Sequence, residues 1–187
     1  MRRRGSTQAT VEQDDGGDMR THDWDDDNED EELEDTPAPG GTHARERALK
    51  DVRAIYRQAD AAYTPFSCPA SGECCQLSRT GRQPWLWLPE WELLTKGRPL
   101  PPPREDGGCP YLDAAGLRCT VYADRPFGCR TFFCERIRGP TRQPAETVGT
   151  LLERLERASQ RREPSLRGPR PLLEWHAEAL AAARKTR

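Results

Sequence analysis

Apolar residues recur at helical spacing on both sides of an irregular central region. On the N-terminal side they stand three or four positions apart, with charged residues between them: Leu49, Val52, Tyr56, Ala59 and Tyr63. This pattern predicts a helix that runs to about Ala62. Thr42 is its expected N-cap, because a threonine hydroxyl can accept a hydrogen bond from a free N–H group of the first turn.

The helical period returns after Gly139-Pro140. One apolar face consists of Val148, Leu151, Leu152, Leu155 and Ala158. A last predicted helix begins near Pro171 and carries Leu172, Leu173, Trp175, His176, Ala179 and Leu180. These stripes hold too much apolar area to remain in water, so we expect both helices to pack on the centre of the chain, on each other or on a partner.

The central region, from Pro65 to Cys134, has no sustained period. Residues 85–88 alternate tryptophan and leucine and predict a short strand. Residues 89–94 predict a short helix with proline in its first turn. Residues 112–119 predict a β-hairpin whose turn lies at positions 114–116.

Composition limits how such a chain can be stabilised. Hydrophobic residues make up 34% and charged residues 32%. Ordering the backbone costs about 1–2 kcal/mol per residue, which so small an apolar fraction offsets poorly over the whole length. Seven cysteines, all between positions 68 and 134, are the obvious additional source of stability.

The charge is segregated along the chain. Between Glu12 and Asp35 stand 14 of the 31 acidic residues, and Arg20 is the one basic residue among them. We interpret residues 1–41 as a disordered acidic tail and linker, either merely solvating or a contact for a basic protein partner. The remainder holds 17 acidic and 25 of the 29 basic residues. Nucleic-acid binding, with Trp85 and Trp87 stacking on bases, is therefore an alternative function, although the basic residues are scattered.

The sequence predicts a cytoplasmic protein. Three arginines follow Met1, but no apolar stretch comes after them as it does in a secretion signal. No run approaches the roughly 20 apolar residues that span a bilayer, so we expect no membrane partner. Thiols stay reduced in the cytoplasm, where clustered cysteines more often bind metal than form disulfides.

The candidate metal ligands stand among glycines, prolines and small residues, which allow loops to turn several sulfurs inward. They are Cys68, Cys74, Cys75, Cys109, Cys119, Cys129 and Cys134. Four thiolates suffice for tetrahedral zinc or a four-iron cluster, so zinc and iron–sulfur both remain open. Structural disulfides, cysteines buried as small apolar residues and a catalytic Cys–His pair are alternatives. The three histidines, His22, His43 and His176, lie outside the cysteine-rich segment. Arg125, Arg130 and Arg136 are candidate donors to thiolates.

The ordered motifs resemble a known family. Cys68-x2-Ser71-x2-Cys74-Cys75, then Cys109-Pro110-Tyr111-Leu112, then the segment from Cys119 through Arg125-Pro126 and Cys129-Arg130 to Cys134, are similar to the YkgJ-like CxxCxxCC cysteine cluster proteins. The resemblance covers about residues 55–140 and implies a domain that chelates zinc or iron. A related cluster in flagellin lysine methylases implies an iron–sulfur centre. Ser71 stands where the family has a cysteine, so a scheme that needs all eight family cysteines does not fit this chain.

These observations predict a mainly α protein with a small irregular cysteine-rich metal-binding core and a short β-hairpin. We expect three parts: the tail (1–41), the cysteine cluster domain with its leading helix (42–140), and C-terminal helices packed on it (141–187). The expected function is metal binding by a structural or redox or iron-related accessory module. The alternative is a nucleic-acid-binding or regulatory protein with a structural zinc site. The sequence carries no nucleotide or methyl-donor motif, so we do not expect a stand-alone enzyme.

Overall fold

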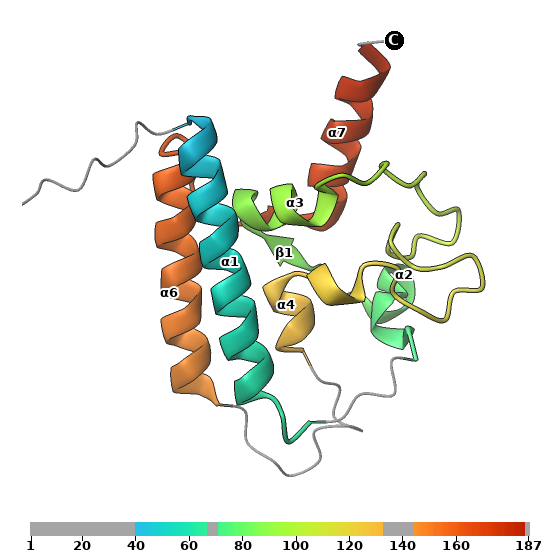
Figure 1. Cartoon of the computed structure of the whole chain (residues 1–187). Helices are drawn as coiled ribbons and strands as arrows, with labels where there is room; N and C mark the ends of the chain where they lie inside the picture. Colours follow the sequence, from blue (N-terminus) through green and yellow to red (C-terminus); the bar gives the residue numbers. More distant parts are fainter. Residues whose placement is uncertain (1–39, 67–70, 133–143, 186–187) are drawn as a thin grey trace, which may run out of the picture. The chain divides into compact units, whose positions relative to one another are not determined.

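Two long helices form one side of the fold. The computed structural model describes residues 40–66, 71–132 and 144–185. Helix α1 (Thr42–Ala62) and helix α6 (Ala145–Arg162) lie side by side and run in opposite directions (Figure 1). Both helices were predicted from their apolar period. The expected cap is wrong in detail, because Gly41 is the N-cap of α1 and no side chain caps it.

The first hydrophobic core lies where these two helices meet. Val52 on α1 and Leu155 on α6 are fully buried. Helix α3 (Leu88–Thr95) closes this core with Leu93. Its N-cap Trp87 also joins the core, as does Phe127, the first residue of helix α4 (Phe127–Arg130). Leu152, which the sequence placed on the apolar face of α6, is 41% exposed and lies at its edge.

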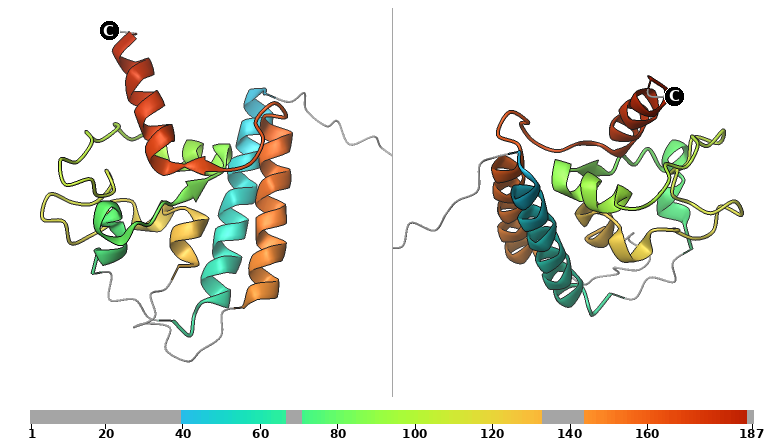
Figure 2. Two further views of the ribbon diagram at one scale, coloured as in Figure 1. Left: turned by 180° about the vertical axis from the view of Figure 1, so that it is seen from behind. Right: turned by 45° about the horizontal axis from the view of Figure 1, so that its top comes forward.

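A second core joins the C-terminus to the centre of the chain. Strand β1 (Trp85–Leu86) pairs antiparallel with β2 (Arg170–Pro171), directly before helix α7 (Leu172–Lys185). The indole N–H of Trp175 on α7 donates to the Leu86 carbonyl at 3.1 Å. Its ring stacks on that of Trp91, with centroids 6.1 Å apart. Figure 2 shows α7 leaving this sheet on the side of α3.

The cysteine-bearing segments are short and irregular. They comprise the 3-10 helices η1 (Glu73–Cys75) and η2 (Tyr122–Asp124) and the helices α2 (Leu77–Thr80) and α4 (Phe127–Arg130). Cys75, Cys109 and Cys119 pack within the second core. That core therefore rests directly on the sulfur-rich region.

The protein is thus mainly helical with a small two-stranded antiparallel sheet, as the sequence predicted in outline. The pairing differs from the prediction. The expected hairpin at 112–119 consists of one antiparallel bridge, Leu112 to Cys119, whereas the two named strands come from distant parts of the chain. None of the described helices has the length and apolar character to cross a bilayer.

Candidate metal centre

Five of the seven predicted ligands lie in the described residues. Cys109 is buried and the others are half-buried, and all five are free thiols: Cys74, Cys75, Cys109, Cys119 and Cys129. Cys68 and Cys134 lie outside the described residues, as does the whole predicted tail before residue 40. No disulfide therefore involves the described cysteines.

A glycine sets the position of the adjacent pair Cys74 and Cys75. Gly72, the N-cap of η1, has a φ of 70°, which lies in the left-handed region. A Cβ there would lie 2.8 Å from the Leu117 carbonyl oxygen, closer than real contacts allow. Glycine thus permits both the turn and the close approach of η1 to the segment that carries Cys119.

Backbone hydrogen bonds bring two further cysteines to this pair. The Cys109 N–H donates to the Cys75 carbonyl at 2.7 Å. The bridge between Leu112 and Cys119 returns the chain toward Cys109, and the Asp113 carboxylate closes the turn by accepting from Leu117 N–H at 2.8 Å. Local turn chemistry therefore gathers residues that are up to 45 positions apart in sequence.

Arg82 connects this group to Cys129. Its guanidinium donates to the Gly128 carbonyl at 2.7 Å and reaches the Cys74 carbonyl at 3.5 Å. It also hydrogen-bonds the Cys129 side chain and thereby lowers the pKa of that thiol, although burial raises this pKa more strongly. The sequence analysis missed Arg82, because no motif marks it; only the fold places it between the two segments.

The thiols lie near enough to change one another's ionisation. The hydrogen bond between the Cys74 and Cys75 side chains, together with the charges of Arg82 and Arg125, lowers the pKa of Cys74 to about 6. The pKa of Cys75 is raised by this same hydrogen bond, by burial, and by the neighbouring sulfurs of Cys109 and Cys119.

Burial also raises the pKa values of the three other thiols. That of Cys109 rises to about 12, and those of Cys119 and Cys129 are raised as well. Among the five described cysteines, Cys74 is therefore the one whose surroundings favour the thiolate in the absence of metal. A metal ion would replace the protons of the other thiols, since thiolates are the form that binds zinc and iron.

The described side chains alone do not form a closed coordination shell. Within residues 40–66, 71–132 and 144–185, no three His, Cys, Asp or Glu side chains have the arrangement of a metal site. The donor set still fits a soft metal, because thiolate sulfur prefers zinc or iron–sulfur clusters. Arg82 and Arg125 supply positive charge beside the sulfurs, as the second layer of a thiolate site requires.

The predicted arginine donors differ in their roles. Arg125 acts electrostatically on two thiols: it contributes to the lowered pKa of Cys74, and it offsets part of the rise that burial causes in the pKa of Cys119. The guanidinium of Arg130 instead binds the Asp60 carboxylate at 2.6 Å and the Arg125 carbonyl at 2.9 Å. Arg136 lies outside the described residues.

His176 and Trp87 have structural positions. His176 is buried, and its Nε2 lies 2.8 Å from the Pro101 carbonyl, which ties α7 to the proline-rich loop. Trp87 is buried in the first core, whereas Trp85 is 53% exposed. The expected pair of exposed, base-stacking tryptophans is therefore wrong for Trp87.

Comparison with known proteins adds no family. No family model, curated protein or solved structure matches the chain.

Proposed function

We propose that the protein binds zinc or an iron–sulfur cluster through its cysteine thiolates, as a structural or redox accessory module of the YkgJ-like type. The observation that carries this proposal is the convergence of five free thiols from separate segments, each altering the pKa of others in the group. Disulfide formation explains that convergence less well, because no disulfide bond joins any of the five in this structure.

The surroundings of the sulfurs support the same conclusion. Several thiolates cannot share one partly buried region without positive charge to balance them. Arg82 and Arg125 supply part of it, and a metal cation would supply the rest. The resemblance of the motif string to the cysteine cluster family agrees with this chemistry, and Ser71 limits the available sulfurs to seven.

The same cysteine ligands could serve a structural zinc ion or an iron–sulfur cluster, and the two would contribute differently. Structural zinc in small peptides contributes about 10–16 kcal/mol of apparent binding free energy, comparable to or larger than the usual net stability of a domain, about 5–15 kcal/mol. The segments that carry the described cysteines contain only short helices, η1, α2, η2 and α4, so metal ligation would fix their arrangement. An iron–sulfur cluster would use the same ligands and add one-electron chemistry.

Anaerobic purification followed by elemental analysis and absorption spectroscopy tests the proposal. We expect a stoichiometric metal content: a colourless zinc protein, or an iron and sulfide protein with broad visible absorption. Cys109→Ser and Cys129→Ser should each lose most of the metal. Ala181→Ser, which places a serine on the exposed face of α7, is the matched control and should retain it.

The result that contradicts the proposal is equally definite. A purified chain without metal that also refuses added zinc and reconstituted iron–sulfur under reducing conditions would exclude it. Full metal content in both cysteine variants would show that neither Cys109 nor Cys129 is a ligand and would contradict the convergence on which the proposal rests.

A further inference from the structure

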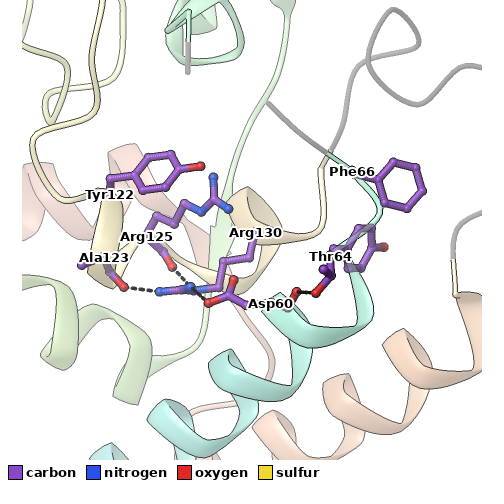
Figure 3. A pocket seen from close by; sticks show the side chains of 8 residues that line it. Asp60, Thr64, Phe66, Tyr122, Ala123, Arg125 and Arg130 are labelled. Atoms are coloured by element: carbon purple, nitrogen blue, oxygen red, sulfur yellow. Dashed lines mark hydrogen bonds and ion pairs between the residues drawn. The ribbon is translucent and has the colours of Figure 1, made fainter. Parts of the chain in front are cut away.

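A cavity of about 470 Å³ lies at the C-terminal end of α1, beside η2 and α4 (Figure 3). Its volume falls in the range of small-molecule sites, about 300–1,000 Å³. The described residues that line it are Asp60, Tyr63, Thr64, Phe66, Tyr122, Ala123, Arg125 and Arg130. None of these lining residues is a cysteine, and the cavity adjoins the candidate metal centre through Arg125.

One of its two arginines is fully engaged by the protein. Arg130 is 6% exposed, and its guanidinium donates to the carbonyls of Arg125 and Ala123 and to the Asp60 carboxylate. Its charge is balanced by Asp60, at an N–O distance of 2.6 Å. Arg130 therefore forms a fixed wall (Figure 3) and is not available to a ligand.

Arg125 differs in this respect. Its guanidinium carbon lies 4.1 Å from the centre of the Tyr122 ring, and it forms no ion pair with an acid of the described segments. Its Nε is buried, and no described residue accepts a hydrogen bond from it. Buried donors are nearly always satisfied, so an unpaired one beside a cavity indicates a missing acceptor.

We propose that this cavity binds a small monocarboxylate with an aromatic or apolar body. The planar guanidinium of Arg125 matches a carboxylate with two parallel hydrogen bonds. The rings of Tyr63 and Phe66, with centroids 5.5 Å apart, provide an apolar wall for the body of the ligand.

The charge of the lining selects among anions. Arg125 and Arg130 carry two positive charges and Asp60 carries one negative charge, which leaves one positive charge for the ligand. A monocarboxylate neutralises it. A phosphate dianion would leave an excess negative charge close to Asp60, and an amine would meet the uncompensated cation.

Titration of the full-length protein, as purified, with phenylacetate tests the proposal by calorimetry or NMR. Phenylacetamide has the same shape without the charge, and phenyl phosphate and phenethylamine supply the other charges. We expect saturable binding of phenylacetate with one site per chain, and binding of the other three weaker by about tenfold or more. Absence of saturable phenylacetate binding, or equal or tighter binding of any comparison compound, overturns the proposal.

Variants locate the binding in this cavity. Arg125→Gln should weaken phenylacetate binding by about tenfold or more. Arg118→Gln removes the same charge from an exposed position outside the lining and should change it by less than about twofold. Parent-like affinity in Arg125→Gln, or an equal loss in Arg118→Gln, rejects the site.

Asp60→Asn gives a test of opposite sign. It removes the one acid of the described lining, while Arg130 keeps its two carbonyl partners, so phenylacetate should bind more tightly, by about threefold to tenfold. Because Arg125 also acts on Cys74 and Cys119, metal content and circular dichroism are measured for each variant. If Arg125→Gln loses metal or fold, Asp60→Asn alone decides, and weaker or unchanged binding in it overturns the proposal.

Discussion

A single buried carboxylate joins three elements of this fold, and its replacement by the neutral isostere is a sharp test of the structure. Glu90 is 1% exposed. Its Oε1 accepts hydrogen bonds from the Tyr56 hydroxyl at 2.9 Å and the Phe127 N–H at 2.7 Å. Its Oε2 accepts from the Trp87 N–H at 3.0 Å. Glu90 therefore connects α1, α3 and the start of α4, the helix that carries Cys129.

The cost of Glu90→Gln follows from these three donors. If the glutamine oxygen takes the place of Oε1, its NH₂ group faces the Trp87 N–H, and two buried donors oppose each other. A buried polar group without a partner costs about 1–3 kcal/mol, and a hydrogen bond to a charged acceptor contributes about 1.5–3 kcal/mol.

One effect acts in the opposite direction. Burial raises the pKa of Glu90, and the three hydrogen bonds and Arg130 offset only part of that rise. Removing the charge therefore recovers some desolvation free energy. We expect a net loss of about 2–4 kcal/mol in the free energy of unfolding. For a chain of this size, that is a fall in Tm of about 5–15 °C.

Urea and thermal unfolding, followed by circular dichroism, measure this change. Glu178→Gln is the matched control: Glu178 pairs with Arg170 at the surface, where its side chain is 61% exposed, and its replacement should cost less than about 1 kcal/mol. Tyr56→Phe removes one donor to Glu90, so the double variant should lose less than the sum of the single losses. An unfolding midpoint for Glu90→Gln equal to that of Glu178→Gln would refute the reasoning.

Three further predictions concern single positions. In the metal-free chain, iodoacetamide should modify Cys74 first at neutral pH, and the reaction should become ever slower below pH about 6. Cys75→Ala removes the hydrogen bond that lowers the pKa of Cys74 and should slow this reaction about tenfold near pH 6.5. Equal reactivity of all thiols would contradict the lowered pKa of Cys74. Gly72→Ala should lower the free energy of unfolding by about 2 kcal/mol or more and loosen the cysteine cluster. Gly81 also has a positive φ but lies in open space, so Gly81→Ala should cost only about 1 kcal/mol. Equal losses in the two variants would exclude the close approach of Gly72 to Leu117. Leu155→Ala should cost about 2–5 kcal/mol in urea unfolding, and Leu152→Ala on the exposed edge of the same helix less than about 1 kcal/mol; the reverse order would misplace the core.

The hydrophobic pattern alone gave the three longest helices. Apolar residues three and four positions apart mark a face that must be buried, and this requirement is local to each helix. The predicted end of α1 and the predicted start of α7 therefore agree closely with the structure, and the apolar face predicted after Pro140 lies within α6. The predicted cap failed, because Thr42 and Gly41 are equally placed in sequence and only the entering backbone decides which residue lies outside the helix.

The pairing of strands from distant segments could not be predicted from the sequence. Trp85 and Pro171 are partners in the sheet, yet two residues per strand leave no alternating pattern that specifies a partner. The same holds for the burial of Trp87 and the exposure of Trp85. Positions 85 and 87 would share a face if the strand continued, but β1 ends at Leu86 and Trp87 is the N-cap of α3, so the alternation does not reach it. Trp87 is buried because it packs in the core between α1 and α6.

The sequence determined which residues can carry chemistry, and the tertiary structure determined which of them meet. Seven cysteines beside glycines and prolines indicate a thiolate cluster, because few other structures need so many sulfurs in one segment. The convergence of the five described cysteines, however, depends on the Gly72 turn, on the hydrogen bond from Cys109 to Cys75, and on Arg82 bridging to α4. The cavity at Arg125 depends on the fold in the same way: the packing of α1, η2 and α4 leaves the Nε of Arg125 buried with no acceptor among the described residues.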